Sequence, residues 1–245
     1  MSPAWLQTLA MVTRPVRHPV NTAVKIGWRL GRLPDQSWRE MALLKTILAS
    51  IGTGTVRVFE WGMGRSTLFY PRYLRDIGRE FEWHAIDHTV QWYERVKRRV
   101  RAAQLESRVF LYCAEIDCDP HRPCVSALAD PERVRQYVEY PKRLPSAFDV
   151  LFVDGRFRRR CLLQAREVVR PEGVVLLHDA QRPYYREALA VYPFSQVVYG
   201  GRFPDSRPPS QMWIGGAGDV TRWSAQDERG MRAPVWSPRR RGHGA

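Results

Sequence analysis

Two stretches of the sequence decide the fold. The first is VRVFEWGMGRST, residues 56–67, in which a β-branched and aromatic segment runs into two glycines and then into polar residues. The second is FEWHAID, residues 81–87, a strand-like segment that ends on an acid. Residues 66–77 between them have the pattern of a helix. A strand, a glycine turn, a helix and a second strand predict two parallel strands of one sheet, joined by a right-handed crossover.

The same alternation continues toward the C-terminus. FDVLFVD (148–154) and GVVLLHD (173–179) are almost continuously apolar, which is typical of strands buried on both faces. Further elements are a strand at 108–114, helices at 35–50, 90–103, 131–140, 157–169 and 183–190, and a final pair of strands at 195–201 and 210–216. We therefore expect an α/β fold: a three-layer sandwich with a mostly parallel sheet and a C-terminal antiparallel strand pair.

Length and composition indicate one globular domain with two extensions. The 245 residues are 44% hydrophobic and 26% charged, which provides for a sizeable core. We place the domain at 36–216, between a basic N-terminal extension (1–35) and a basic mobile tail (217–245). No apolar run reaches the ~20 residues of a membrane span, and the N-terminus lacks a signal-peptide pattern. A cytoplasmic protein is expected, and the amphipathic extension packs on its own domain, on a second subunit, or peripherally on an anionic membrane.

The charge of the chain is strongly positive and carried almost wholly by arginine. The formal net charge is +14, and only four of the 39 basic residues are lysines. One interpretation is an acidic partner, such as a phosphorylated or uronate-bearing substrate, nucleic acid or an anionic membrane. The other interpretation is that many of these arginines lie on solvent-exposed faces of helices and have no specific partner.

Four cysteines are too few for a disulfide scaffold at this length. Cys118, His121 and Cys124 lie together in CDPHRPC. For this cluster we favour free thiols in a reducing compartment over a zinc site or a loop disulfide.

The glycine turn and the acid after the second strand are suited to a nucleoside ligand. Gly62 permits the tight turn, and Gly64 lets a ligand approach the backbone. Ser66 and Thr67 can cap the following helix, whose free N–H groups favour a negative group. Glu60 ahead of the glycines disfavours a pyrophosphate and suits an amino group, while Asp87 can accept both hydroxyls of a ribose. The structural alternative is an ordinary glycine turn, with Asp87 as a helix cap.

A second group of polar residues ends the two buried strands. Asp154 follows one, and His178 and Asp179 follow the other. The carboxyl ends of parallel strands meet at one sheet edge, where ligands bind. His178 could take a proton from a hydroxyl as general base, or Asp154 and Asp179 could hold a divalent ion. Alternatively, Asp154 caps the next turn and His178 is hydrogen-bonded beneath the sheet edge.

Together these motifs resemble the class I methyltransferases that depend on S-adenosylmethionine (SAM), and the likeness covers roughly residues 56–216. In that family the fold is Rossmann-like, the glycine turn lies under the methionine part of SAM, and the acid after the second strand binds the ribose. The resemblance therefore implies SAM as cofactor. The implied cofactor positions are Glu60, Gly62, Gly64, Ser66, Thr67 and Asp87, with His88 and Glu115 near the adenine.

The VDG and HDxxR segments are similar to metal-assisted O-methyltransferases and, more narrowly, to sugar-modifying enzymes such as the glucuronoxylan 4-O-methyltransferase group. This implies O-methylation of a hydroxyl on a sugar or another polar, acidic small molecule, with Asp154 and Asp179 as metal ligands. Catechol-type enzymes place an amide ligand after the second acid, and Ala180 stands there instead.

Arg156 and Arg182 are expected to bind the acidic substrate. Two alternatives are a non-catalytic binding or scaffold protein with this fold and a nucleic-acid methyltransferase. The latter is disfavoured because the chain lacks an N/D-P-P-Y-type motif.

Overall fold

The computed structural model describes residues 23, 26–27, 30–116, 130–199 and 211–223. Cys118 and Cys124, most of the N-terminal extension and the tail after residue 223 lie outside these ranges. Predictions about them are therefore not addressed by the structure.

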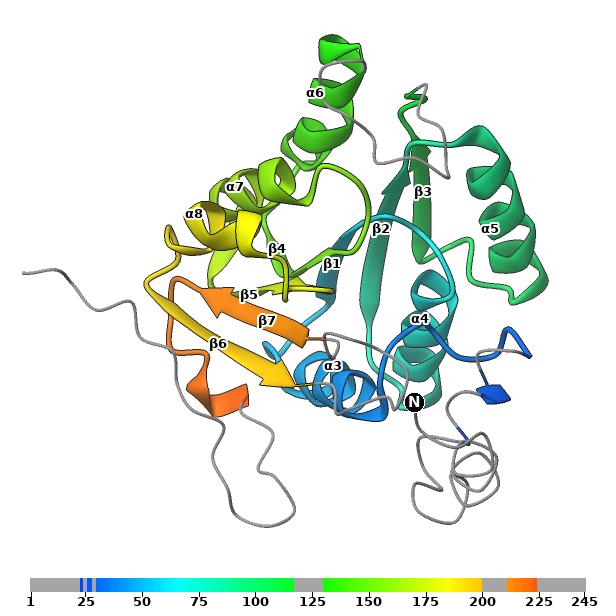
Figure 1. Cartoon of the computed structure of the whole chain (residues 1–245). Helices are drawn as coiled ribbons and strands as arrows, with labels where there is room; N and C mark the ends of the chain where they lie inside the picture. The colour runs from blue at the N-terminus through cyan, green and yellow to red at the C-terminus, as the bar shows by residue number, and fades with distance from the viewer. Residues whose placement is uncertain (1–22, 24–25, 28–29, 117–129, 200–210, 224–245) are drawn as a thin grey trace, which may run out of the picture.

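One sheet runs through the described part of the chain, with seven strands in the order β3-β2-β1-β4-β5-β7-β6 (Figure 1). The strands β1 to β5 are mutually parallel, while β7 is antiparallel to both of its neighbours, β5 and β6. Their bounds are β1 Val56–Trp61, β2 Phe81–Asp87, β3 Val109–Cys113, β4 Phe148–Val153, β5 Val169–Leu177, β6 Phe194–Tyr199 and β7 Gln211–Gly216. The mostly parallel sheet and its C-terminal antiparallel pair are confirmed.

Helices cover both faces of the sheet and complete the three layers (Figure 1). One face carries α3 (Trp38–Ser50), α4 (Ser66–Asp76) and α5 (Val90–Ala102). The other carries α6 (Pro131–Glu139), α7 (Arg158–Val168) and α8 (Arg186–Leu189). Three short 3₁₀ turns are η1 (Tyr140–Arg143), η2 (Pro183–Tyr185) and η3 (Thr221–Trp223). The helix predicted at 183–190 is thus a 3₁₀ turn followed by one short α-helix.

The hydrophobic core is divided by the sheet into two clusters. Alternate residues of each central strand point to opposite faces: Val58 joins the cluster under α3–α5, and Phe59 joins the cluster under α6–α8. Every residue of β4 is buried, as its almost continuously apolar pattern predicts; Asp149 is its one charged residue. Apolar side chains therefore fill the core on both faces of the central strands, and several polar side chains lie where these strands end.

Helix α3 begins at a reciprocal cap that also places an acid inside the protein. The Ser37 side chain accepts a hydrogen bond from the Glu40 backbone N–H, and a Glu40 oxygen accepts from the Ser37 N–H at 2.7 Å. Glu40 is fully buried by this arrangement. The same helix packs Leu44 and Ile47 against the core.

The packed domain extends past the predicted boundary at residue 216. Val220 and Trp223 are buried in the core, and the Gln196 side chain donates to the Val220 carbonyl at 3.0 Å. Residues 217–223 therefore belong to the domain and not to a mobile tail. At the other end, Pro34 is buried just before the predicted boundary. None of the helices in the described ranges combines the length and the apolar character needed to cross a membrane.

Candidate functional site

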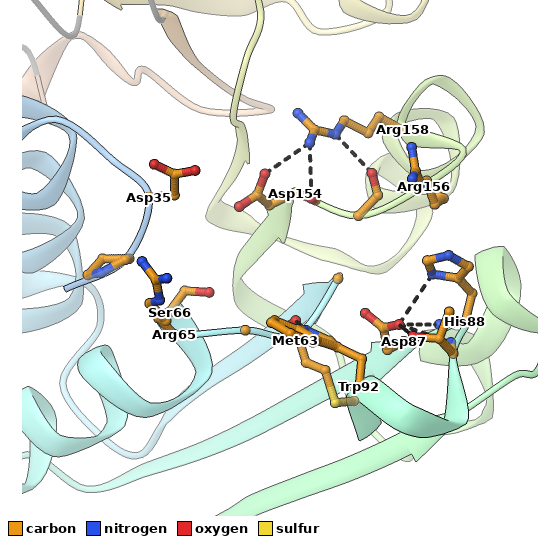
Figure 2. A pocket seen from close by; sticks show the side chains of 15 residues that line it. Asp35, Met63, Arg65, Ser66, Asp87, His88, Trp92, Asp154, Arg156 and Arg158 are labelled. Carbon is orange, nitrogen blue, oxygen red and sulfur yellow. Dashed lines mark hydrogen bonds and ion pairs between the residues drawn. The ribbon is translucent and has the colours of Figure 1, made fainter. Parts of the chain in front are cut away.

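A cavity of about 500 Å³ opens at the carboxyl ends of β1, β2 and β4 (Figure 2). The strand order reverses between β1 and β4, which is where open α/β sheets bind ligands. The volume is within the range of small-molecule and cofactor pockets. The cavity is lined by Pro34, Asp35, Gly62, Met63, Gly64, Arg65, Ser66, Asp87, His88, Thr89, Trp92, Asp154, Gly155, Arg156 and Arg158.

The floor of this pocket is a close contact between two glycine turns. Gly62 has a φ of +90°, and a side chain there would collide with the backbone of Gly155. A side chain on Gly155 would in turn meet the Tyr137 hydroxyl and Gly62. The Gly64 N–H donates to the Thr67 hydroxyl at 2.8 Å, which fixes the turn against the start of α4. The sequence predicted the role of Gly62, but Gly155 was missed although it stands in the VDG segment.

Glu60 lies beneath the pocket and does not line it. Its side chain is completely buried and accepts hydrogen bonds from the Ser66 hydroxyl, the Thr67 hydroxyl at 2.8 Å and the Trp83 indole at 2.8 Å. Burial raises the pKa of Glu60 to about 7, although these three donors act in the opposite direction. Glu60 thus connects the glycine turn to β2 from below. Thr67, also fully buried, links Glu60 to the turn, because its hydroxyl donates to Glu60 and accepts from the Gly64 N–H.

Asp87 occupies the β2 side of the pocket. The carboxylate oxygen Oδ1 accepts from the backbone N–H of His88 at 2.8 Å, and from the N–H and hydroxyl of Thr89, both at 3.0 Å. Among the described residues no donor reaches Oδ2, so this oxygen is available to a ligand. His88 lies beside it, with Nδ1 3.2 Å from Asp87 Oδ1. Trp92 closes this side by donating to the Met63 carbonyl.

The opposite wall is built around the guanidinium of Arg158, the first residue of α7. It donates to the Gly155 carbonyl at 2.9 Å, to the carbonyl and Oδ1 of Asp154 at 3.0 Å each, and to the His178 carbonyl. Its Nη1 also lies 3.5 Å from Asp179 Oδ2. The Arg158 side chain is only 15% exposed. One cation therefore holds the ends of β4 and β5 together; Figure 2 shows its contacts on the β4 side. The sequence indicated Arg158 only as one of five arginines beside these strand ends that suit an acidic substrate, and not as the residue that joins the two strands.

His178 is hydrogen-bonded behind this wall. Its Nδ1 lies 2.9 Å from Asp154 Oδ1, and its Nε2 lies 3.9 Å from Glu40 Oε1. Burial disfavours the charged ring, but the Asp154 carboxylate, with Glu40 and Asp179 nearby, outweighs it and raises the pKa of His178 to about 9. The ring does not line the pocket and is protonated at neutral pH. The predicted general-base role does not agree with this geometry, whereas the alternative of a ring hydrogen-bonded at the sheet edge does.

Asp154 is the acid of this group that faces the pocket. Burial opposes its ionisation, yet His178 and Arg158 hold its pKa below the usual range. Both cations contact Oδ1, and Oδ2 accepts no hydrogen bond from the described residues. Its side chain is 25% exposed, so a ligand can reach that oxygen.

The residues proposed for a divalent ion do not form a metal site. Asp179 adopts a φ of +56° after β5, and its carboxylate reaches Arg158. The Arg158 guanidinium therefore supplies the positive charge between Asp154 and Asp179 that an ion would supply. In the described ranges no group of three or more His, Cys, Asp or Glu side chains has the geometry of a metal site.

The remaining predicted residues divide between the pocket and the surface. Arg156 lines the pocket, and its backbone N–H donates to the Tyr137 hydroxyl at 3.3 Å. Arg182 does not line it; its guanidinium reaches the Tyr184 hydroxyl at 3.4 Å. Glu115 is exposed after β3 and also lies outside the pocket lining. Pro34 and Asp35, which the sequence assigned to an extension, form part of the wall.

Comparison with known proteins agrees with this architecture. A family model described as a methyltransferase domain matches residues 59–180, about half of the chain. The O-methyltransferase TomG from Streptomyces achromogenes, involved in tomaymycin synthesis and solved in complex with SAM, is similar with 16% identity and a TM-score of 0.52. That match covers 78% of this chain and 86% of TomG. No curated protein matches the sequence.

Two further structures share the fold. The CMeT domain of the citrinin polyketide synthase has 13% identity and a TM-score of 0.51, over 74% of this chain and 52% of that domain. This chain thus spans about half the length of the domain. Spermidine synthase from Thermotoga maritima has 12% identity and a TM-score of 0.50, over 82% of this chain and 67% of the enzyme. At such identities the likeness concerns the fold alone.

Proposed function

The chain belongs to the class I SAM-dependent methyltransferases, and we propose that it methylates a hydroxyl oxygen of a polar, acidic small molecule such as a sugar. The observation that carries this proposal is the placement of two free carboxylate oxygens in one cavity. Asp87 offers one on the β2 side, and Asp154 offers the other on the opposite wall.

The residues of the cavity fit the cofactor. Asp87 Oδ2 is free to accept from the ribose hydroxyls, and the open space beside the Gly64 backbone leaves room for the amino-acid part. His88 and Trp92 provide flat surfaces on the same side as Asp87. When bound, SAM would supply a methyl group attached to a positively charged sulfur, and an oxygen nucleophile can accept that methyl group. Glu60, Thr67 and Glu115 are not assigned contacts with it, since they do not line the cavity.

Asp154 is assigned the role of orienting the acceptor. Its Oδ2 can accept the hydrogen bond of an acceptor hydroxyl, while Arg158 and His178 fix the other oxygen. The low pKa of Asp154 makes it a weak base, so it aligns the oxygen, and the hydroxyl proton finally passes to water. Much of the rate gain in such a transfer comes from alignment of the reacting groups. Because Arg158 and His178 already hold the Asp154 carboxylate in place, this alignment does not require a divalent ion.

Calorimetry with SAM and with S-adenosylhomocysteine tests the cofactor site, and transfer of labelled methyl groups from SAM to a panel of acidic sugars tests the reaction. Asp154→Asn should bind SAM within about threefold of the wild type and lose at least about 100-fold in turnover. Glu106→Gln is the matched control, because Glu106 is an exposed acid paired with Arg101. Turnover retained by Asp154→Asn, or folded protein that binds neither SAM nor its product, contradicts the proposal.

A further inference from the structure

A second cavity, of about 270 Å³, lies between α3 and α4 and is bordered by cations. Arg65, Leu68, Phe69, Arg72 and Tyr73 reach it from the start and one face of α4, as their spacing of three and four residues requires. We call it the basic groove and define it by its four cations, Arg32, Lys45, Arg65 and Arg72. One acidic residue, Asp76, also lines the groove. Its carboxylate lies 3.4 Å from the guanidinium of Arg75, which is outside the groove.

The four cations of the basic groove have no carboxylate partner among the described residues. Lys45 Nζ lies over the rings of Phe69 and Tyr73, at 5.0 and 4.9 Å from their centroids, and Arg65 reaches only the Leu33 carbonyl at 3.5 Å. The aromatic contacts hold the ammonium in place without neutralising it. Four like charges around one small cavity repel one another, so an anion that enters gains from all of them.

The basic groove adjoins the larger pocket. Arg65 lines both cavities, and residues 31–32 of the groove lead directly to Pro34 and Asp35 of the pocket wall. Figure 2 shows Arg65 and Asp35 at one end of the pocket, and Asp87 and His88 at the other. A molecule seated against the pocket wall can therefore reach the groove from the end opposite the ribose-binding acid.

The arginines around α7 are less suited to this task. Arg158 is engaged by the ends of β4 and β5, and Arg159 pairs with Glu187. Arg182 does not line the pocket. The unneutralised charge close to the pocket lies instead on α3, α4 and residue 32.

We propose that the basic groove binds a phosphate group, and, resting on the proposed methyl transfer, that this phosphate is carried by the methyl acceptor. A phosphate monoester carries up to two negative charges and three acceptor oxygens, which the forked donors of Arg32, Arg65 and Arg72 can share. Lys45 adds a point charge from the facing helix. A carboxylate offers one charge and two oxygens and leaves most of these donors unused.

The first test measures the binding of inorganic phosphate to the full chain by calorimetry at low salt. The wild type should bind it, and Arg72→Gln and Lys45→Gln should each weaken binding by roughly tenfold, the value of one charge-assisted hydrogen bond. Neither residue lines the cofactor pocket, so SAM binding should be unchanged in both. Arg99→Gln is the matched control, because it removes one exposed arginine from α5. No phosphate binding, or equal weakening by all three substitutions, overturns the proposal.

The second test distinguishes a soluble phosphate ester from a lipid headgroup. The same variants are sedimented with vesicles of phosphatidylcholine and phosphatidylglycerol in equal amounts, and glucose 6-phosphate is titrated in parallel. Loss of glucose 6-phosphate binding in Arg72→Gln, with vesicle binding unchanged, identifies a soluble acceptor. Loss of vesicle binding alone identifies a lipid phosphate. Because SAM binding and phosphate binding are read separately, failure of the methyl-transfer proposal leaves the groove result intact, and the reverse also holds.

Discussion

Replacement of Arg158 by methionine should be among the most damaging single changes in the domain. The side chain is 15% exposed and is tied to four groups in the turns directly after β4 and β5: the carboxylate and carbonyl of Asp154 and the carbonyls of Gly155 and His178. Methionine fills a similar volume but leaves the Asp154 carboxylate without one of its two cations. Removal of one partner of a buried ion pair costs about 3–5 kcal/mol, and the partial exposure of Asp154 places this case near about 3 kcal/mol.

Urea unfolding followed by circular dichroism measures this loss. With a slope of about 1–3 kcal/mol per molar for urea, a loss of about 3 kcal/mol lowers the midpoint by at least about 1 M. Arg159→Met is the matched control on the next residue, since its ion pair with Glu187 is exposed and should contribute about 1 kcal/mol or less. If Arg158→Met and Arg159→Met unfold at the same urea concentration, Arg158 does not hold the two strand ends together.

Three further predictions concern the cofactor acid, the buried glutamate and the histidine. Asp87→Ala should weaken SAM binding by about 10- to 100-fold in calorimetry, because the ribose loses its charged acceptor; unchanged affinity would remove Asp87 from the site. Glu60→Ala should lower the free energy of unfolding by about 3 kcal/mol, because three buried donors lose their acceptor; a change below about 1 kcal/mol would contradict the bonding described. The raised pKa of His178 contributes stability that is complete below about pH 6.5 and lost as pH rises through about 9. His178→Gln should therefore flatten the fall in unfolding free energy across that window, and a profile as steep as that of the wild type would place the titrating group elsewhere.

The fold was predictable because each element carried its own local signal. The continuous apolar run of β4 and the glycines after β1 are properties of a few adjacent residues, and such signals need no knowledge of distant contacts. The prediction was wrong at the C-terminal boundary. Val220 and Trp223 have no periodic neighbours, and their burial depends on Gln196 and the sheet edge, which are distant in sequence.

The candidate site was predictable in its position and less so in its roles. Parallel strands end at one sheet edge, which is why Gly62, Asp87 and Asp154 could be placed together. Which acid faces the cavity depends on side-chain partners across the sheet. Glu60 is turned inward by Ser66, Thr67 and Trp83, and Trp83 belongs to β2.

The charge of His178 illustrates the same limit. A lone histidine after a strand has the pattern of a base, but its pKa is set by Asp154, 24 residues away, and by Glu40, whose position depends on a helix cap. The adjacent Asp179 also contributes, but nothing near His178 in the sequence indicates the contacts with Asp154 and Glu40.

The source of positive charge at this edge of the sheet has a consequence for how the site is assembled. Carboxylates at the ends of adjacent strands need a counter-charge to stand close together, and an enzyme that uses a divalent ion must take that charge from solution. Here Arg158 and the protonated His178 provide it from within the chain, so Asp154 is fixed when β4 and β5 come together. Turnover should then be indifferent to chelators, while substitutions at Arg158 affect folding and turnover together. Substitutions of Lys45 or Arg72 in the basic groove should act on the acceptor alone, because neither residue lines the cofactor pocket.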